Sequence, residues 1–591
     1  MLEAVRANVS KDAATNIERW LNEPKYAEYK AELESLILGE EWKTLEDSFY
    51  TTIEFGTAGI RGSTGLGSAR ISRVTIGEAT QALCDYIVSL DDSAKDAGIV
   101  IAHDTRLTSV EFAELAASVC AGNGVMAYIF DGYRSTPELS FAVRYLKASA
   151  GIVISASHNP PSDNGFKAYL SDGAQLVSPH DQAVTELVRK TEEIRSSEFY
   201  VGVEIGDIDI IGKEVDEAYI NAVASQAVGE ARDLSIVYSP LHGAGQRNTI
   251  PVLEAAGFSI STVASQMTPD GNFPTVENNK PNPEERAAND LAVAQMMSTE
   301  ADIAITNDPD ADRIGVMVRQ GEEPKYLSGN QTAALATEFV LSQVAQKGNL
   351  TNQHYIAKTV VTTDLMDAIA NRYGAKVYGD MLIGFKYIGE LLLQKESSNE
   401  TFLIGAEESY GMLLGDYARD KDGAAGALVM AEYAAELRSQ GMTLYDKLLT
   451  LYSEYGIFAE RLDTIVCPGA KGFGQMQSIM AMLRSQPPKA VGSHEVTSVV
   501  DYQTLTRMYS DGTQESVPCS STGNMIVLEF GDHRCRISVR PSGTEPKLKL
   551  YVQWHEQTEA TELAQVEELY LDLQDRLEGI SRELEGMLLN T

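Results

Sequence analysis

The chain has 591 residues, which is too long for one hydrophobic core and predicts several domains. Hydrophobic residues make up 43% and charged residues 23% of the chain, a composition typical of a folded globular protein. A formal charge of −37 disfavours nucleic acid and anionic membranes as partners, because both bind basic surfaces. An anionic small molecule would need a local site built from cations and backbone amides.

The sequence also bears on the compartment. No uncharged apolar run reaches the roughly 18 residues that span a membrane. The N-terminal stretch MLEAVRANVSKDAATNIERWLNE is polar, has the periodicity of a surface helix and lacks an apolar signal core. Five scattered cysteines predict neither a disulfide framework nor a cysteine metal site. We therefore expect a reduced, cytoplasmic protein.

The first polar run in the chain is EFGTAGIRG, residues 54–62, which contains Arg61. Its glycines do not follow a strand and no ribose-binding acid pattern accompanies them, which disfavours dinucleotide binding. The strand predicted at 98–104 ends in HDTR. There we expect a structural salt bridge or a support for the loop that holds Ser157, with Arg106, in preference to direct catalysis. A helix is predicted at 109–124.

The strand predicted at 151–157 leads into the loop SHNPPSDNGFK, which ends at Lys167. Ser157 stands at the corner beside His158, a position from which a serine could act as a nucleophile. The loop lacks the GxSxG pattern of serine esterases, which disfavours that chemistry. Taken alone, a turn rich in Pro, Asn, Asp and Gly is an equally good interpretation.

Strands predicted at 234–240 and 301–307 precede the run NDPDADR, which holds Asp308, Asp310 and Asp312. Two such charges about 4 Å apart repel by about 4 kcal/mol at an effective dielectric near 20. A hard cation removes that cost, and an all-oxygen set suits Mg²⁺. An EF-hand is excluded, because Arg313 occupies the position of its invariant glycine. A solvated acidic turn is the alternative.

After a helix predicted at 331–348, the strand predicted at 402–408 leads into GAEESYG and then RDKDG. Carboxylate and hydroxyl groups at a strand end, here Glu407 and Ser409, can hold sugar hydroxyls. A nearby lysine such as Lys421 can transfer a proton or hold phosphate. Each of these features is weak when taken alone.

The C-terminal segment changes character. Residues 536–554 predict two strands joined by the turn RPSGTEPK, followed by a helix from about residue 558, which is an α+β pattern. Free backbone amides, two hydroxyls and the flanking cations Arg540 and Lys547 make the turn a candidate phosphate cradle. The turn is not a nucleotide P-loop, since GxxxxGK[ST] is absent. An ordinary hairpin turn is the alternative.

The alternation of strands and helices over most of the chain indicates α/β domains with largely parallel sheets. Each polar cluster follows a hydrophobic strand, where open α/β sheets bind their ligands. Four such clusters predict four domains that contribute to one site. Boundaries are expected near residue 206, near 321–325 and near 455–460.

The ordered runs FGTAGIRG, SASHNP, DPDADR, GAEESYG with RDKDG, and RPSGTEPK resemble the α-D-phosphohexomutase superfamily from about Phe55 to Lys547. SPLHGAG (239–245), FPTVENNKPNPEE (273–285) and IGFKYIG (383–389) are similar to its phosphoglucomutase-2-like and bacterial α-phosphoglucomutase branch. The resemblance implies a heart-shaped fold around one cleft, with three similar α/β domains that have mixed sheets and a smaller C-terminal α+β domain. The implied domains are 1–206 for the phosphoserine, 207–323 for the metal, 324–456 for the sugar and 457–591 for phosphate.

The resemblance also implies roles for individual residues. Ser157 would carry the phosphoryl group, and one Mg²⁺ per chain would be bound by Asp308, Asp310, Asp312 and Ser157. The implied sugar contacts are Glu407, Ser409 and Lys386. The implied grip on the non-reacting phosphate is Arg540, Ser542, Gly543, Thr544 and Lys547. The positions matched to proton transfer or phosphate contact are His158, Lys167 and Lys421, and the general base is open among them. The supporting residues are Arg61, Arg106 and Arg313.

The activity that the resemblance implies is a phosphoglucomutase with glucose 1,6-bisphosphate as intermediate and activator. Phosphomannomutase and phosphopentomutase activities stay open, because GDMLI (379–383) departs from the usual Thr-containing lead-in to Lys386. A glucose-1,6-bisphosphate synthase, which would use the same phosphoserine with an external phosphoryl donor, is a further alternative. Hexose phosphates are the expected partners of a monomer or homodimer. A non-catalytic sensor is disfavoured, since Ser157, the aspartates and Arg540 are all present.

Overall fold

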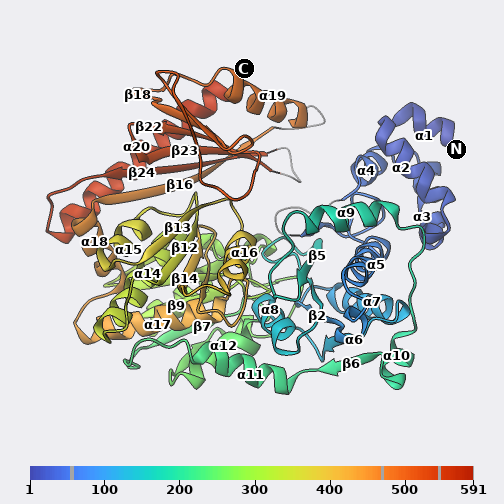
Figure 1. The fold of residues 1–591 in the computed structure, drawn as a ribbon, viewed down its shortest axis with the longest axis horizontal. Helices are drawn as coiled ribbons and strands as arrows, with labels where there is room; N and C mark the ends of the chain where they lie inside the picture. Colours follow the sequence, from blue (N-terminus) through green and yellow to red (C-terminus); the bar gives the residue numbers. More distant parts are fainter. Residues whose placement is uncertain (54–58, 468–471, 543–546, 590–591) are drawn as a thin grey trace.

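The computed structural model describes residues 1–53, 59–467, 472–542 and 547–589. These residues form four sheets of four or more strands, and we number the four corresponding units in chain order. In Figure 1 the fourth unit, coloured dark orange to red, lies against the third, and the blue N-terminal helices lie beside the first. None of the described helices combines the length and the apolar character needed to cross a bilayer.

The N-terminal segment folds into several short helices instead of the single surface helix that the sequence predicts. They are α1 (Leu2–Asn8), α2 (Lys11–Asn22), η1 (Pro24–Tyr29), α3 (Lys30–Leu38) and α4 (Trp42–Phe49). Val9 is extended, and the Ser10 side chain accepts a hydrogen bond from Ala13 N, so a new helix begins there. Trp20 stacks on Tyr26 with ring centroids 4.4 Å apart, inside a small core of this segment.

The first unit has a sheet with strand order β1-β5-β4-β2-β3-β6, in which β1 and β5 run antiparallel. Its strands are β1 (Ile60–Ser63), β2 (Ile99–His103), β3 (Ala127–Phe130), β4 (Ala150–Ile154), β5 (Asp163–Leu170) and β6 (Ile208–Ile211). Its helices are α5 (Arg73–Leu90), α6 (Ala94–Ala97), α7 (Ser109–Gly122), α8 (Thr136–Tyr145), α9 (His180–Lys190) and α10 (Phe199–Ile205). Because β4 ends at Ile154, Ser157 lies in the following loop and not at the strand end.

The second unit has the order β11-β10-β9-β7-β8. Its strands are β7 (Ile236–Ser239), β8 (Ile260–Thr262), β9 (Ile303–Asn307), β10 (Ile314–Gln320) and β11 (Glu323–Leu327). Its helices are α11 (Lys213–Ala224), α12 (Gly245–Ala255), η2 (Ala264–Gln266), η3 (Glu277–Asn279), η4 (Arg286–Asn289) and α13 (Asp290–Ser298). Since β9 and β10 pair antiparallel, residues 308–313 form the turn between them.

The third unit has the order β13-β12-β14-β15, with β15 antiparallel to β14. Its strands are β12 (His354–Thr359), β13 (Lys376–Met381), β14 (Thr401–Glu407) and β15 (Gly411–Leu414). Its helices are α14 (Gly329–Gln346), α15 (Leu365–Tyr373), α16 (Lys386–Lys395), α17 (Gly423–Ser439) and α18 (Leu444–Tyr455). The turn that joins β14 to β15 holds Ser409.

The fourth unit has an antiparallel sheet of order β16-β24-β23-β22-β19-β20-β21. Its strands are β16 (Ile457–Val466), β19 (Ser498–Asp501), β20 (Thr506–Tyr509), β21 (Gln514–Ser516), β22 (Ile526–Phe530), β23 (Asp532–Pro541) and β24 (Lys547–Glu556), beside the small pair β17 (Ala490–Val491) and β18 (His494–Glu495). Its helices are α19 (Gly472–Ser485) and α20 (Leu563–Leu589). The predicted class of three α/β units and a C-terminal α+β unit is confirmed.

A buried charge network joins the third and fourth units. Arg536 on β23 pairs with both carboxylate oxygens of Asp364, through Nη1–Oδ2 at 2.5 Å and Nη2–Oδ1 at 3.0 Å. The same guanidinium donates to Val360 O at 2.9 Å, and Gln553 Nε2 donates to Thr362 O at 3.2 Å. A bidentate pair of this kind fixes the orientation of one sheet against the other.

Glu460 at this junction gives a pH-dependent prediction. Burial raises the pKa of its carboxyl to about 7. The negative charge of Asp364 raises this pKa further, whereas a hydrogen bond with Thr363 lowers it. Because this pKa is higher in the folded protein than in the unfolded chain, the stability that the group contributes is fully present below the unfolded pKa. That stability is lost as the pH rises through the folded pKa of about 7. Glu460→Gln is therefore expected to stabilise the protein by about 1–2 kcal/mol at pH 8 and to change little at pH 5. Thermal unfolding at both pH values measures this, and an equal shift at both would contradict it.

Candidate active site

Ser157 occupies a strained and buried position in the loop after β4. Its φ angle is +52°, in the left-handed region that non-glycine residues seldom adopt. Ser157 Oγ donates a hydrogen bond to Asp308 Oδ2 at 2.5 Å and lies 3.2 Å from His158 Nδ1. The backbone N–H of Ser157 donates to Ser155 Oγ at 2.8 Å. The hydroxyl is thus aimed at the acidic turn of the second unit.

Arg106, which follows β2, holds the Ser157 loop. Its two terminal nitrogens donate to four carbonyl oxygens of the loop at 2.5–2.8 Å, those of Ser157, Asn159, Pro160 and Asp163. Its Nε lies 3.1 Å from Asp104 Oδ2, and both side chains are buried. The sequence places Arg106 and Ser157 far apart, but adjacent parallel strands β2 and β4 bring their carboxyl ends together. Arg106 therefore fixes the loop conformation without touching Oγ.

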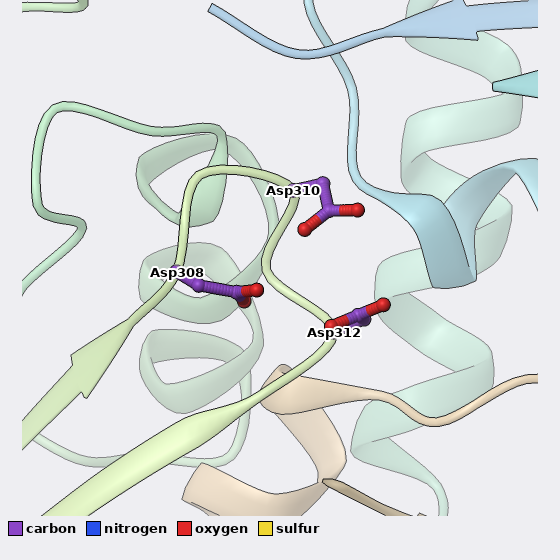
Figure 2. A group of neighbouring side chains, drawn as sticks. All are labelled: Asp308, Asp310 and Asp312. Atoms are coloured by element: carbon purple, nitrogen blue, oxygen red, sulfur yellow. The ribbon is translucent and has the colours of Figure 1, made fainter. Parts of the chain in front are cut away.

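Asp308, Asp310 and Asp312 gather on the β9–β10 turn (Figure 2). One oxygen from each of the three buried carboxylates lies within 4.8 Å of the others. Among the described residues, Asp310 Oδ1 and Asp312 Oδ1 have no hydrogen-bond partner despite their burial. Orphaned buried oxygens of this kind need a partner, and hard oxygen donors suit Mg²⁺. The residues present thus fit a bound Mg²⁺.

Two lysines from other units reach the same turn. Lys167 Nζ on β5 lies 2.7 Å from Asp310 Oδ2 and 3.2 Å from Asp312 Oδ2. Lys421 Nζ, from the third unit, lies 3.0 Å from Asp312 Oδ2 and 4.0 Å from Glu407 Oε1. Three of the four units therefore meet at the acidic turn.

The charges at the turn set the protonation of its carboxyls. Burial and the two neighbouring aspartates raise the pKa of Asp308 well above its usual range. Burial opposes ionisation of Asp310 as well, but Lys167 outweighs it and holds the pKa well below the usual range. Burial lowers the pKa of Lys167, yet Asp310 and Asp312 raise it overall. Asp310 and Lys167 are therefore a charged pair at neutral pH.

The predicted sugar contacts lie on the neighbouring turn of the third unit. Ser409 Oγ donates to Glu407 Oε1 at 2.6 Å, so the two side chains form one polar group. Glu408 accepts from Thr359 Oγ1 at 3.2 Å, and burial together with Glu407 raises its pKa to about 7. The third predicted sugar contact, Lys386, is on α16, and its Nζ lies 3.5 Å from Asp181 Oδ2 of the first unit.

The predicted phosphate cradle is the β23–β24 hairpin. Ser542 N donates to Lys547 O at 2.8 Å and closes the hairpin, while Gly543 and Thr544 lie outside the described residues. Arg540 pairs across the strands with Lys549, which the sequence did not single out. Desolvation lowers the pKa of Lys549, and the nearby carboxylates of Glu284 and Glu408 oppose that shift. The hairpin therefore carries a cationic edge toward the second and third units.

Comparisons with known proteins identify the family of the chain. Family models of the phosphoglucomutase/phosphomannomutase α/β/α domains I, II and III match residues 52–195, 217–321 and 328–455, and the model of the C-terminal domain matches 521–569. The chain belongs to the phosphoglucomutase/phosphomannomutase family. A phosphoglucomutase of Staphylococcus haemolyticus is 35% identical over 513 residues, covering 86% of this chain and 91% of its own. One from Staphylococcus aureus strain MRSA252 is 34% identical over 511 residues, covering 86% and 90%.

Solved structures share the fold. A putative phosphomannomutase from Thermus thermophilus has a TM-score of 0.63 at 22% identity and covers 90% of this chain and 99% of its own. The open form of parafusin, a phosphoglucomutase from Paramecium, also has a TM-score of 0.63, at 17% identity, and covers 90% and 96%. At these identities the likeness concerns the fold of the family.

Three further predicted residues lie around the Ser157 loop and the acidic turn. Arg313 follows the acidic turn, and its Nη1 donates to Glu284 Oε1 at 2.7 Å while its backbone N–H donates to Asp308 Oδ1 at 3.1 Å. Arg61 lies on β1 opposite Gly165 of β5. Burial lowers the pKa of His158 well below its usual range, and Arg313 and Arg61 lower it further. His158 is therefore neutral at pH 7.

Thr136, which no predicted motif included, joins the first unit to the acidic turn. Thr136 Oγ1 donates to Asp310 Oδ2 at 2.8 Å, and its backbone N–H donates to Asp310 O at 2.9 Å. The signal was present, because Ser135 and Glu138 form the S-x-x-E pattern of a helix start just after β3. A polar helix start after a buried strand is the same signal that marks the other clusters.

Proposed function

We propose that this chain is a phosphoglucomutase, which interconverts α-D-glucose 1-phosphate and glucose 6-phosphate through phosphorylated Ser157. The observation that carries the proposal is the 2.5 Å contact between Ser157 Oγ and Asp308 Oδ2, which joins two motifs 151 residues apart. A candidate nucleophile beside a metal-binding turn is the arrangement that phosphoryl transfer needs. The phosphoglucomutases at 34–35% identity support glucose as the sugar.

The reaction begins with a phosphoryl group on Ser157. A free hydroxyl of the hexose monophosphate attacks the phosphorus, the bond from phosphorus to Ser157 Oγ breaks, and glucose 1,6-bisphosphate forms. We infer that the proton of the attacking hydroxyl passes to the neutral imidazole of His158. Burial lowers the pKa values of Lys167 and Lys421, but neighbouring carboxylates raise them overall, so both lysines are already protonated and act as cations. The bisphosphate then turns over and returns its other phosphoryl group to Ser157, which releases the isomeric monophosphate.

The side chains of this chain supply binding and charge. Asp308, Asp310 and Asp312, with an oxygen of the phosphorylated serine, would hold one Mg²⁺, which when bound offsets the charge on the transferring phosphoryl oxygens. Glu407 and Ser409 would accept and donate hydrogen bonds to vicinal sugar hydroxyls. Arg540, Ser542 and Lys547 on the hairpin would grip the phosphate that does not react.

The test is a coupled assay that follows glucose 6-phosphate formation from glucose 1-phosphate with Mg²⁺ and trace glucose 1,6-bisphosphate. Mass spectrometry of the peptide around Ser157 follows phosphorylation in the same samples. Turnover that EDTA abolishes, with phosphate on Ser157, is the expected result. Turnover of mannose 1-phosphate or ribose 1-phosphate in preference to glucose 1-phosphate would overturn the sugar assignment. Full activity in EDTA would overturn the proposed requirement for Mg²⁺.

A further inference from the structure

Arg106 also contacts the second unit. Its guanidinium carbon lies 5.3 Å from the ring centroid of Phe273, within the range of a cation–π interaction. Phe273 is fully buried and opens the run FPTVENNKPNPEE, a motif to which the proposed chemistry gives no role. The residue that holds the Ser157 loop is thus itself covered by an aromatic ring from another unit.

The ring of Phe273 is held rigidly. Its φ angle of +48° is unfavourable for a bulky residue, so surrounding contacts must maintain it. Asn279 Nδ2 donates to Asn272 O at 2.8 Å and to Phe273 O at 3.3 Å. The side chain packs in a small apolar cluster with Leu241, Val276 and Ala288.

The backbone of the same segment presses against Arg106. A Cβ placed on Gly271 would lie 2.7 Å from Arg106 Cα and 2.6 Å from Leu107 N, closer than real Cβ contacts allow. Only glycine permits this approach, so the two segments are in backbone contact. The position of Phe273 relative to Arg106 is therefore fixed by main chain as well as by the ring.

The segment is also tied to the acidic turn. His242 hydrogen-bonds through its two ring nitrogens to Thr268 O at 2.8 Å and Thr275 Oγ1 at 2.9 Å. Two residues farther along, Ala244 N donates to Pro309 O at 2.8 Å, within the turn that bears the aspartates. The segment that holds Gly271 and Phe273 thus contacts Arg106, and through the His242 loop it is connected to the turn that bears the three aspartates.

We propose that Phe273 is a positioning residue for phosphoryl transfer at Ser157, acting through Arg106, an inference that rests on the function proposed above. The planar guanidinium of Arg106 can donate to four carbonyl oxygens only if its plane keeps one orientation. The aromatic ring that lies over the guanidinium holds that orientation. Tilting the guanidinium displaces the loop and so moves Ser157 Oγ relative to Asp308. Displacements of about 1 Å at a reacting group can cost about 10²-fold in rate.

A double-mutant cycle tests this role. Phe273→Leu keeps most of the apolar volume and removes the ring, and we expect kcat to fall about tenfold with KM within about twofold. In an Arg106→Lys background the planar fork is absent, so Phe273→Leu should lower kcat by less than about twofold more. The rate of phosphoryl loss from Ser157 to glucose 1-phosphate in a single turnover should follow the same pattern.

Val276→Ala is the matched control, because Val276 belongs to the same buried cluster, whereas the ring that lies over Arg106 is that of Phe273. Its kcat should stay within about twofold of the wild type although its melting temperature falls. A Phe273→Leu enzyme as fast as the wild type, an equal loss in both Arg106 backgrounds, or an equal loss in Val276→Ala would each overturn the inference. A wild type without turnover would instead overturn the proposed function.

Discussion

Replacing Ser157 with alanine is expected to lower kcat by about 10⁴-fold or more, since the proposed carrier of the phosphoryl group between the two half-reactions is lost. The loop itself should persist, because Arg106 binds carbonyl oxygens and the Ser157 N–H still donates to Ser155. Alanine also tolerates the φ of +52° no worse than serine does. We therefore expect loss of turnover without loss of fold, measured by the coupled assay and by thermal unfolding.

Ser162→Ala is the control for this experiment. Ser162 lies in the same loop, is exposed and donates its hydroxyl to Asp163 Oδ1 at 3.0 Å, away from the acidic turn. Its activity should remain within about twofold of the wild type, as for most exposed substitutions. Residual phosphorylation and full turnover in Ser157→Ala would show that another residue carries the phosphoryl group.

Much of this site could be predicted because its residues lie at strand ends or in the loops that directly follow them. Ser157, Asp308 and Glu407 each follow or close a hydrophobic strand, and carboxyl ends of parallel strands meet at one edge of a sheet. The pattern also predicted the two-strand hairpin around Arg540. What the strands do not specify is how four sheets face one another, so the contact of Lys167 with Asp310 was not foreseen.

The residues that were missed make contacts between segments that are distant in sequence. Thr136 contacts Asp310 of another unit, and Glu284 contacts Arg313 within the second unit, so no local sequence pattern predicts either pair. Phe273 lies in an irregular segment where a left-handed backbone is held by Asn279, which propensities for strands and helices do not describe. Tertiary packing decides such positions, so a sequence indicates that they are unusual without indicating what they touch.

Replacing Lys167 with methionine is expected to destabilise the metal-free protein by about 3–5 kcal/mol, because the buried Asp310 carboxylate loses its cation. Lys167 is only 2% exposed, so water cannot take its place without rearrangement. kcat should fall by about 10²-fold as well, since a cation next to the transferring phosphoryl group is lost. Thermal unfolding in EDTA and the coupled assay measure the two effects.

Magnesium distinguishes the two consequences of this substitution. Without Lys167, the three aspartates of the β9–β10 turn carry more uncompensated negative charge. A bound cation should therefore stabilise the variant more than the wild type. Mg²⁺ should therefore restore much of the melting temperature of Lys167→Met while kcat stays low. Lys190→Met, which breaks a surface pair with Glu186 that is 72% and 65% exposed, should change stability by less than about 0.5 kcal/mol. If Mg²⁺ raised the melting temperatures of wild type and Lys167→Met equally, the three aspartates would not be the site at which it binds.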